Sequence, residues 1–294
     1  MLIHHHPVPQ DPARVVVLGG HGFIGGALLA ALERGGIPTL APSSLELDLT
    51  GEDAGPRLAA MLRPTDAVVL LAALTPDKGR GAVPFLKNLQ MAAGVGAALE
   101  KATPAHVVYF GSDAVYPLEV GLISEESCAQ PADLYGVMHL AREVMVKSAA
   151  KAPVAVLRST LVYGAGDTHN SYGPNRLRRM ARKEGRIALF GEGDETRDHI
   201  LVDDATALAL LVLRHRSTGL LNLATGRSIS YAELARKVAV LFDRPIEIVT
   251  TPRQNPITHR HFDITTVRTA FPTFAFTPLE KGLAKAHREM LERE

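Results

Sequence analysis

Residues 14–32 read RVVVLGGHGFIGGALLAAL, and this stretch decides the fold. An apolar run at 15–18 leads into Gly19, Gly22 and Gly25, and a helical pattern follows at once. Glycines in such a strand–turn–helix setting permit a tight turn, let the backbone approach a pyrophosphate and allow close helix–strand packing. The amino end of the helix adds backbone donors and a positive dipole. The stretch predicts a dinucleotide-binding turn; a purely structural turn is the alternative.

Short apolar runs alternate with helical stretches along the first half of the chain. Runs that are apolar throughout are typical of strands covered on both faces. The predicted strands are residues 15–18, 38–41, 67–71, 106–110 and 154–158, with a further strand in 220–225. This alternation predicts an α/β fold, a doubly wound parallel Rossmann sheet of about seven strands.

The composition of the sequence changes after residue 163, where polar, glycine-rich segments are followed by a predicted basic helix. We expect a dinucleotide-binding Rossmann core at 14–163 and a smaller interleaved C-terminal lobe, mainly for substrate, at 164–294. Residues 200–224 are expected to return to the core. The opening residues 1–13 contain three consecutive histidines and no long apolar run, and they are expected to form a disordered leader.

Composition narrows the function classes. The 294 residues carry a formal net charge of +1, which gives no electrostatic case for nucleic acid or a membrane surface as partner. No apolar run is long enough to span a membrane, and the single cysteine, Cys128, suits a reducing compartment. The histidines show no metal-ligand spacing. These features predict a cytoplasmic protein without a metal site.

Further motifs follow in order along nearly the whole chain. They are VVLLAAL at 68–74, Asn88, YFGSDAVYP at 109–117, Tyr135, LRSTLVYGAG at 157–166 and GEGDETRDHILVDD at 191–204. With the Gly-x-x-Gly-x-x-Gly spacing at 19–25, this series resembles the extended short-chain dehydrogenases/reductases, the NAD-dependent epimerase/dehydratase family. The resemblance implies NAD as cofactor, with NADP not excluded, and a nucleoside diphosphate sugar as substrate.

By this resemblance, Ser112 and Tyr135 are the catalytic pair and His139 supports them. A tyrosinate can take a proton from a sugar hydroxyl while hydride leaves the same carbon, and a serine hydroxyl can hold the oxygen. The alternative is that Ser112 only satisfies a strand end and Tyr135 only packs. The implied cofactor-binding residues are Gly19, Gly22, Phe23, Ile24, Gly25, Ser43, Asp48, Leu71, Ala72, Ala73, Tyr135 and His139.

The most consequential departure from the family pattern is His139. The family has a lysine four residues after the tyrosine, which holds the nicotinamide ribose and lowers the tyrosine pKa. An imidazole is shorter and mostly neutral at pH 7, so its electrostatic effect on Tyr135 is weaker, although it can donate to a ribose hydroxyl. If its protonated form matters, the rate is expected to fall as the pH rises through the imidazole pKa.

Two other departures bear on the reaction and the cofactor. Family dehydratases have an aspartate and a glutamate after strand five, but here the segment reads Ser112-Asp113-Ala114. The missing glutamate favours a 4-epimerase-like or 4-ketoreductase-like enzyme over a dehydratase. The second strand ends in neither an acid for a ribose hydroxyl nor an arginine for a 2′-phosphate, so the sequence does not decide between NAD and NADP.

The resemblance also implies a substrate site and an assembly. Guanidinium groups suit a diphosphate because they bond bidentately and stay charged. The implied substrate-binding residues are Ser112, Asp113, Asn175, Arg197 and Arg253. The broadly apolar helices at 83–101 and 133–150 are expected to pair with their copies in a homodimer. A dinucleotide-binding sensor or scaffold without turnover is the rival interpretation, and His139 is the residue that favours it.

Overall fold

The main sheet is built around the strand that precedes the glycine turn. The computed structural model describes residues 2–119, 121–167, 169 and 173–292. The seven strands lie in the order β1-β10-β6-β5-β4-β2-β3, and all neighbours are parallel except β1 and β10. In that order the strands are Ile3–His4, Ser217–Leu223, Val154–Ser159, His106–Ser112, Asp66–Leu70, Arg14–Leu18 and Thr39–Leu40. This architecture confirms the predicted doubly wound α/β fold.

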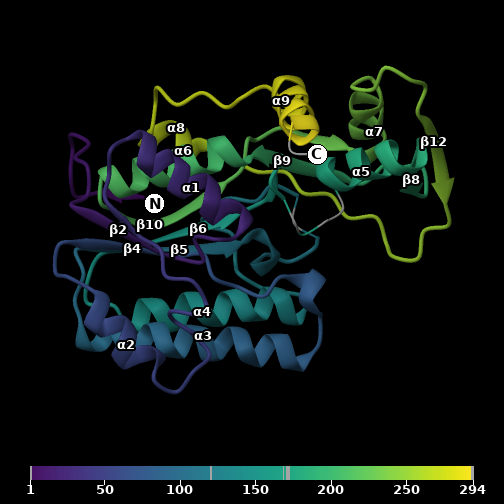
Figure 1. Ribbon diagram of the computed structural model, residues 1–294. Coiled ribbons are helices and arrows are strands. Elements are labelled where there is room, and N and C mark those ends of the chain that lie inside the picture. Colours follow the sequence, from purple (N-terminus) through teal and green to yellow (C-terminus); the bar gives the residue numbers. More distant parts are fainter. Residues whose placement is uncertain (1, 120, 168, 170–172, 293–294) are drawn as a thin grey trace.

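Helices cover both faces of the sheet, as Figure 1 shows. Side chains of β2 alternate between two hydrophobic clusters, with Val15 and Val17 in one and Val16 and Leu18 in the other. This alternation explains why the strand is apolar throughout. The first face carries α1 (Phe23–Arg34), α6 (Val202–Arg214) and α8 (Thr265–Ala270). The second face carries α2 (Ala54–Met61), α3 (Ala82–Lys101) and α4 (Leu134–Ala149).

The N-terminal residues differ from the sequence expectation. Residues 3–4 form β1 and pair with Ser217 and Thr218 at the edge of the sheet. His4 bonds through Nδ1 to the Ser217 hydroxyl at 2.8 Å and through Nε2 to the Ala270 carbonyl at 3.0 Å. Its ring also stacks on His215, with centroids 4.4 Å apart. The prediction of a disordered leader is therefore wrong for this segment, because a free sheet edge satisfies its backbone and side chains.

A smaller lobe lies beside the carboxyl ends of the main strands (Figure 1). Two small sheets contribute to it: β7 (Leu161–Tyr163), β9 (Thr196–Leu201) and β11 (Ser228–Ser230) form one, and β8 (Arg186–Phe190) and β12 (Glu247–Thr251) form the other. Its helices are α5 (Pro174–Glu184), α7 (Tyr231–Ala239) and α9 (Leu279–Glu292). The lobe has its own hydrophobic cluster. Helix α6 and strand β10 take the chain back to the main sheet.

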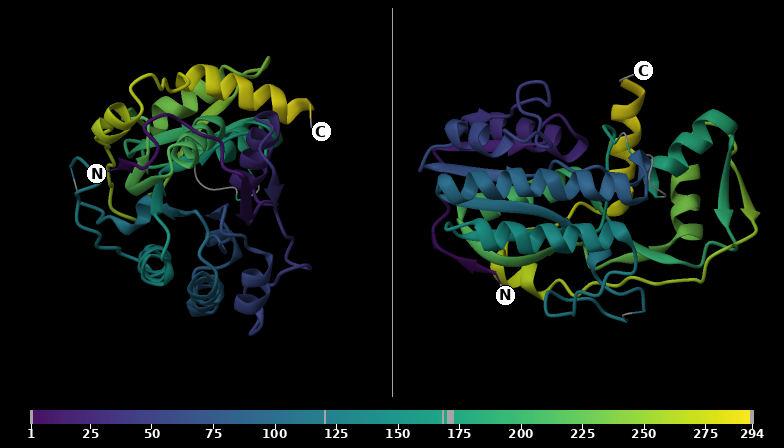
Figure 2. Two further views of the ribbon diagram at one scale, coloured as in Figure 1. Left: turned by 90° about the vertical axis from the view of Figure 1, so that its left-hand side faces the viewer. Right: turned by 90° about the horizontal axis from the view of Figure 1, so that it is seen from below.

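The two longest helices lie side by side on the outside of the second face. Figure 2, viewed from below, shows α3 and α4 running together beneath the sheet. Both carry exposed apolar side chains, among them Val83, Leu86, Val137 and Val144. Within the described ranges, no helix is long and apolar enough to cross a membrane.

Candidate active site

The glycine turn between β2 and α1 brings backbone very close to backbone. A Cβ atom on Gly25 would lie 2.1 Å from the Gly19 carbonyl oxygen, and one on Gly19 would lie 2.5 Å from the Ala72 nitrogen. Gly19 also has a φ of +92°, a backbone angle that residues with a side chain rarely adopt. At Gly22 the nearest atom to such a Cβ is 3.3 Å away. Gly19 and Gly25 are therefore needed for the fold, whereas a Cβ at Gly22 would make one tight contact, with the Gly19 carbonyl oxygen, and otherwise face open space.

A cavity of about 200 Å³ opens in front of this turn, at the carboxyl ends of the central strands. We call it the cofactor cavity. Its lining residues are Gly19, Gly22, Phe23, Ile24, Gly25, Leu71, Ala72, Ala73, Thr75, Phe110, Gly111, Tyr135, His139, Ser159 and His169. The glycine turn, the end of β4 and the start of α4 thus converge on one space. In open α/β sheets ligands bind at this edge.

Tyr135 stands in the first turn of α4. Asp133 caps this helix by accepting a 2.8 Å hydrogen bond from the Gly136 amide. Gly136 has no room for a side chain, because a Cβ would lie 2.2 Å from the Ala114 carbonyl oxygen. This contact packs the start of α4 directly on the turn after β5. Burial and the nearby Asp113 carboxylate raise the pKa of Tyr135 to about 12, whereas the Ser112 hydroxyl and Arg142 act to lower it.

Ser112 is the last residue of β5, and Asp113 follows it. Ser112 is 8% exposed, and its hydroxyl accepts a 3.2 Å hydrogen bond from the Ala114 amide. Asp113 lies in the short 3₁₀ helix η2 (Asp113–Val115) and faces Arg260, whose Nε is 3.8 Å from its carboxylate. Burial raises the pKa of Asp113 and Arg260 opposes the rise. Asp113, the carboxylate next to Tyr135, is therefore paired with Arg260.

His139 stands one helical turn after Tyr135, and the two rings meet edge to face with centroids 4.6 Å apart. Its Nδ1 lies 2.8 Å from the Tyr109 hydroxyl on β5. Its Nε2 is buried and has no hydrogen-bond partner among the described residues. Burial, together with the nearby Arg142, lowers the pKa of His139 to about 3. The imidazole is therefore neutral at working pH, so the expected fall in rate through an imidazole pKa near neutrality is not supported.

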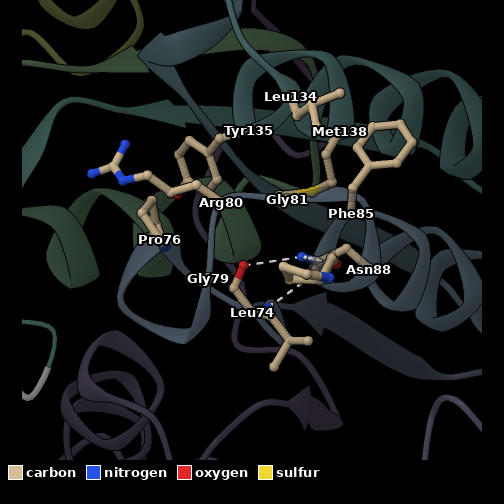
Figure 3. A pocket seen from close by; sticks show the side chains of 11 residues that line it. Leu74, Pro76, Gly79, Arg80, Gly81, Phe85, Asn88, Leu134, Tyr135 and Met138 are labelled. Carbon is tan, nitrogen blue, oxygen red and sulfur yellow. Dashed lines mark hydrogen bonds between the residues drawn. The ribbon is translucent and has the colours of Figure 1, made fainter.

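A second, small pocket adjoins Tyr135 on the side of α3 (Figure 3). Asn88 fixes its floor: the side-chain oxygen accepts from the Leu74 amide at 2.8 Å, and the side-chain nitrogen donates to the Leu74 carbonyl at 3.0 Å. The same oxygen accepts a 3.0 Å hydrogen bond from Arg142. Arg80 lines the pocket from the exposed loop before α3. Asn88 therefore connects the loop after β4 to the helix that carries Tyr135.

Ser43 and Asp48 lie in the loop after β3 and do not line the cofactor cavity. The Ser43 hydroxyl donates to Glu46 at 2.8 Å. Asp48 is exposed and accepts from the amide and hydroxyl of Thr50, at 2.9 and 2.7 Å, which lowers its pKa. Both side chains thus make local turn contacts.

The other three predicted substrate-binding residues, Asn175, Arg197 and Arg253, also make internal contacts. Asn175 is buried at the start of α5, donates to Asp167 at 2.8 Å and accepts from the Gly164 amide at 3.3 Å. Arg197 donates to the Thr258 carbonyl at 2.7 Å and contacts Glu195. Arg253 approaches the same Glu195 carboxylate at 3.4 Å. The structure therefore brings the two arginines together around one acid and places Asn175 in a separate, buried position.

Sequence reasoning missed several residues of the site. Tyr109 and Arg142 surround His139 from β5 and α4. Thr75, Phe110, Gly111, Ser159 and His169 line the cofactor cavity. One signal was available for Arg142: it lies seven residues after Tyr135 and three after His139, a spacing that places all three on one side of a helix.

Comparisons with known proteins agree on one family. Residues 15–224 match the family described as the NAD dependent epimerase/dehydratase family. A dTDP-L-rhamnose 4-epimerase from Burkholderia thailandensis is 32% identical over 124 residues, which are 40% of this chain. The matched part is only 34% of that relative's length.

Solved structures match over nearly the whole chain. MoeE5 in complex with UDP-glucuronic acid and NAD has a TM-score of 0.80 at 27% identity, covering 95% of this chain and 99% of its own. A UDP-N-acetylglucosamine 4-epimerase from Methanobrevibacter ruminantium M1, in complex with UDP-N-acetylmuramic acid, has a TM-score of 0.83 at 20% identity, covering 97% and 100%. The second likeness is one of fold.

Proposed function

The chain belongs to the NAD dependent epimerase/dehydratase family, and from that premise we propose that it is an NAD-dependent enzyme acting on a sugar carbon of a nucleoside diphosphate sugar. One observation carries the proposal: a single cavity is lined by the glycine turn and by Tyr135 and His139. MoeE5, which is similar over almost its full length, has been solved with NAD and a UDP-sugar. Oxidation or reduction at the sugar, of the 4-epimerase or 4-ketoreductase type, is the chemistry that we propose.

The residues of the cofactor cavity fit a dinucleotide. Gly22 leaves room beside the amino end of α1, where backbone amides and the helix dipole favour a pyrophosphate. The unpartnered Nε2 of His139 offers a hydrogen bond to a ribose hydroxyl. When bound, a nicotinamide cofactor accepts or returns hydride at the sugar carbon.

The protein's own part in the reaction is to hold the substrate oxygen and move its proton. Tyr135, in its phenolate form, would take the proton from the sugar hydroxyl, and its hydroxyl would return that proton in the reverse direction. The Ser112 hydroxyl, at the carboxyl end of β5, would hold the same oxygen in place. Asp113 is followed by Ala114 and not by a second acid, which supports the epimerase or reductase reaction over dehydration.

A non-catalytic dinucleotide-binding protein is the second candidate. It is favoured by one specific observation, the neutral His139 where the family pattern has a lysine. Binding of the cofactor does not separate the two candidates, because both require it. Turnover does.

The test begins with mass spectrometry of the purified protein under native conditions, to detect any retained cofactor. Wild type and Tyr135→Phe are then assayed with UDP-, dTDP-, GDP- and CDP-sugars. We expect turnover in wild type and a loss of roughly 10²–10⁴-fold in Tyr135→Phe, with NAD binding nearly unchanged. Full activity in Tyr135→Phe would refute the assigned acid/base. Absence of turnover in wild type across the panel would support the non-catalytic candidate.

A further inference from the structure

Arg142 is a buried guanidinium without an acidic partner. Its side chain lies on α4 and the residue is 0% exposed. It donates to the Asn88 side-chain oxygen at 3.0 Å and to the Ala72 carbonyl at 2.5 Å, and its Nε has no partner. Among the described residues, no carboxylate lies within salt-bridge distance of it. Such burial of an unpaired charge is costly and calls for a functional reason.

The adjacent position on α4 shows the contrast. Glu143 forms a buried, bidentate pair with Arg158, with nitrogen–oxygen distances of 2.9 and 2.8 Å. The carboxylate of Glu143 therefore neutralises the buried Arg158 of β6. Arg142, the neighbour of Glu143 on α4, has no such carboxylate among the described residues. The guanidinium carbon of Arg142 lies 5.5 Å from the centre of the Tyr109 ring, and Tyr109 bonds His139 of the site. The guanidinium carbon of Arg158 lies over a different ring, 4.9 Å from the centre of Tyr116, which does not line the cofactor cavity.

The electrostatic surroundings of Tyr135 make this charge distinctive. Within the described part of the chain, seven titratable or charged side chains surround Tyr135. From the same helix and the residue before it come Asp133, His139 and Arg142. From other elements come Tyr109 on β5, Asp113 on η2, Arg80 before α3 and His169 after β7. The two aspartates oppose ionisation of the phenol, and His139 is neutral. Arg80 is exposed to solvent, where screening is strong. Burial lowers the pKa of the Arg142 guanidinium, and Tyr109 and Tyr135 oppose that fall. An arginine starts from so high a pKa that it keeps its charge. Because Arg142 is buried, its field at Tyr135 is weakly screened.

We propose that Arg142 is a positioning residue for the reaction proposed above, on which this inference rests: its guanidinium supplies the fixed positive charge that favours the tyrosinate form of Tyr135, while His139 supplies only a hydrogen bond. The contacts to Asn88 and Ala72 hold that charge behind the cofactor cavity. Two side chains of α4 thus share the two tasks that one lysine at position 139 would perform.

The decisive experiment measures ionisation of the phenol directly, without cofactor or substrate. Replacing Tyr135 by difluorotyrosine gives a more acidic phenol, whose titration in the folded protein is followed by fluorine NMR. Arg142→Gln removes the charge but keeps an amide donor for the Ala72 carbonyl. We expect it to raise the pKa of the phenol by roughly one unit. Arg142→Lys keeps the charge, so we expect the pKa to stay near its wild-type value.

A rescue variant separates charge from architecture. In Arg142→Gln combined with His139→Lys, a new cation on the same face of α4 should return the phenol pKa towards wild type. Lys147→Gln, which removes an exposed cation from the last turn of the same helix, is the matched control and should leave the pKa unchanged. Thermal unfolding of each variant reports whether it is folded.

Three results would overturn the proposal. The first is an unchanged phenol pKa in folded Arg142→Gln, which would make Arg142 a purely structural support for Asn88 and Ala72. The second is a rise in Arg142→Lys as large as that expected for Arg142→Gln, a test that stands even if the glutamine variant does not fold. The third is a double variant without any rescue. Because the titration needs no turnover, a failure of the proposed reaction is distinguishable from a failure of this inference.

Discussion

The Tyr109 hydroxyl lies 2.8 Å from Nδ1 of His139, and this contact fixes which ring nitrogen carries the proton. Burial raises the pKa of Tyr109, so its phenol keeps its proton and donates it. Among the described residues, the other acceptor of that hydroxyl is the His139 carbonyl, which is 3.5 Å away. Nδ1 therefore accepts, and the neutral ring has its hydrogen on Nε2, the nitrogen without a partner. His139 is thus prepared as a donor.

Tyr109→Phe should weaken NAD binding by roughly 0.5–1.5 kcal/mol, since Nε2 is no longer held as the donor. Isothermal calorimetry measures this. Tyr116→Phe is the matched control, because Tyr116 is also buried and its hydroxyl donates to Asn222 at 2.7 Å, away from the cofactor cavity. Both variants should lose some stability, but only Tyr109→Phe should lose affinity. Equal affinities in the two variants would contradict the assigned role of His139.

Gly22→Val should abolish dinucleotide binding and leave the fold intact. A Cβ at Gly22 would lie 3.3 Å from the Gly19 carbonyl oxygen, a tight contact that a backbone shift of a few tenths of an ångström relieves. The rest of the side chain would fill the space beside the amino end of α1. Thermal shifts with NAD(H) and NADP(H) measure binding. Gly26→Val, one turn further along α1, is the control; its Cβ would make an ordinary contact at 3.8 Å, and Gly26 does not line the cofactor cavity. Undiminished binding in Gly22→Val would disprove the assigned pyrophosphate position.

Arg253→Ala should weaken binding of the nucleoside diphosphate by roughly 1.5–3 kcal/mol, the scale of a charge-assisted hydrogen bond. Its contacts to Glu195 and Phe190 are long, 3.3–3.4 Å, so the guanidinium can turn to a ligand at little cost. Arg197→Ala should have an effect of the same size and also loosen the contact with Thr258. Calorimetry with UDP and dTDP tests this, with exposed Arg236→Ala as control. Wild-type affinity in both variants would place the diphosphate elsewhere.

The sequence predicted those parts of the fold whose cause lies in neighbouring residues, and it did not predict parts that depend on distant ones. The strands around Val16, Val69 and Val108 are apolar because both faces of the sheet are covered, so their pattern alone located them. The glycine turn was equally local. The seventh strand, Ile3–His4, could not be predicted, because it exists only where a distant edge, Ser217–Leu223, accepts it.

The candidate site shows the same division. The positions of Tyr135 and His139 follow from helical spacing, and both line the cofactor cavity. The charge state of His139 does not follow from spacing, because burial and Arg142 lower its pKa to about 3. The partners of Arg197 and Arg253 were also beyond sequence reasoning, since Glu195 and Thr258 meet them only through the fold of the C-terminal lobe.

The exposed apolar side chains of α3 and α4 predict a homodimer formed by these helices. Val144 is 61% exposed on α4, so Val144→Glu should place a charge in that interface and produce monomers. Sedimentation velocity at micromolar concentration distinguishes the 31.5 kDa chain from its dimer. Val240→Glu, at an 81% exposed valine beyond α7, is the control and should not change the assembly. Monomeric wild type would refute the predicted interface.

Stability should fall as the solution is made acidic. Burial lowers the pKa of His106 to about 4 and those of His139 and His199 to about 3, from an ordinary 6.5. Below pH 6.5 the unfolded chain takes up protons on these histidines and the folded chain does not, so acid favours unfolding. Each histidine should contribute a loss of roughly 1–2 kcal/mol at pH 5. Asp198, whose pKa burial raises to about 6, acts in the opposite direction, as do Asp113 and Asp204, whose pKa values burial also raises.

His106→Gln isolates one share of this acid sensitivity. The His106 Nε2 bonds the Ser217 carbonyl at 2.7 Å, and a glutamine amide can donate to the same oxygen without titrating. The difference in melting temperature between pH 7 and pH 5 should therefore be smaller in His106→Gln than in wild type. An identical pH dependence in His106→Gln and wild type would mean that His106 takes up its proton equally in the folded and the unfolded chain, which would contradict the lowered pKa.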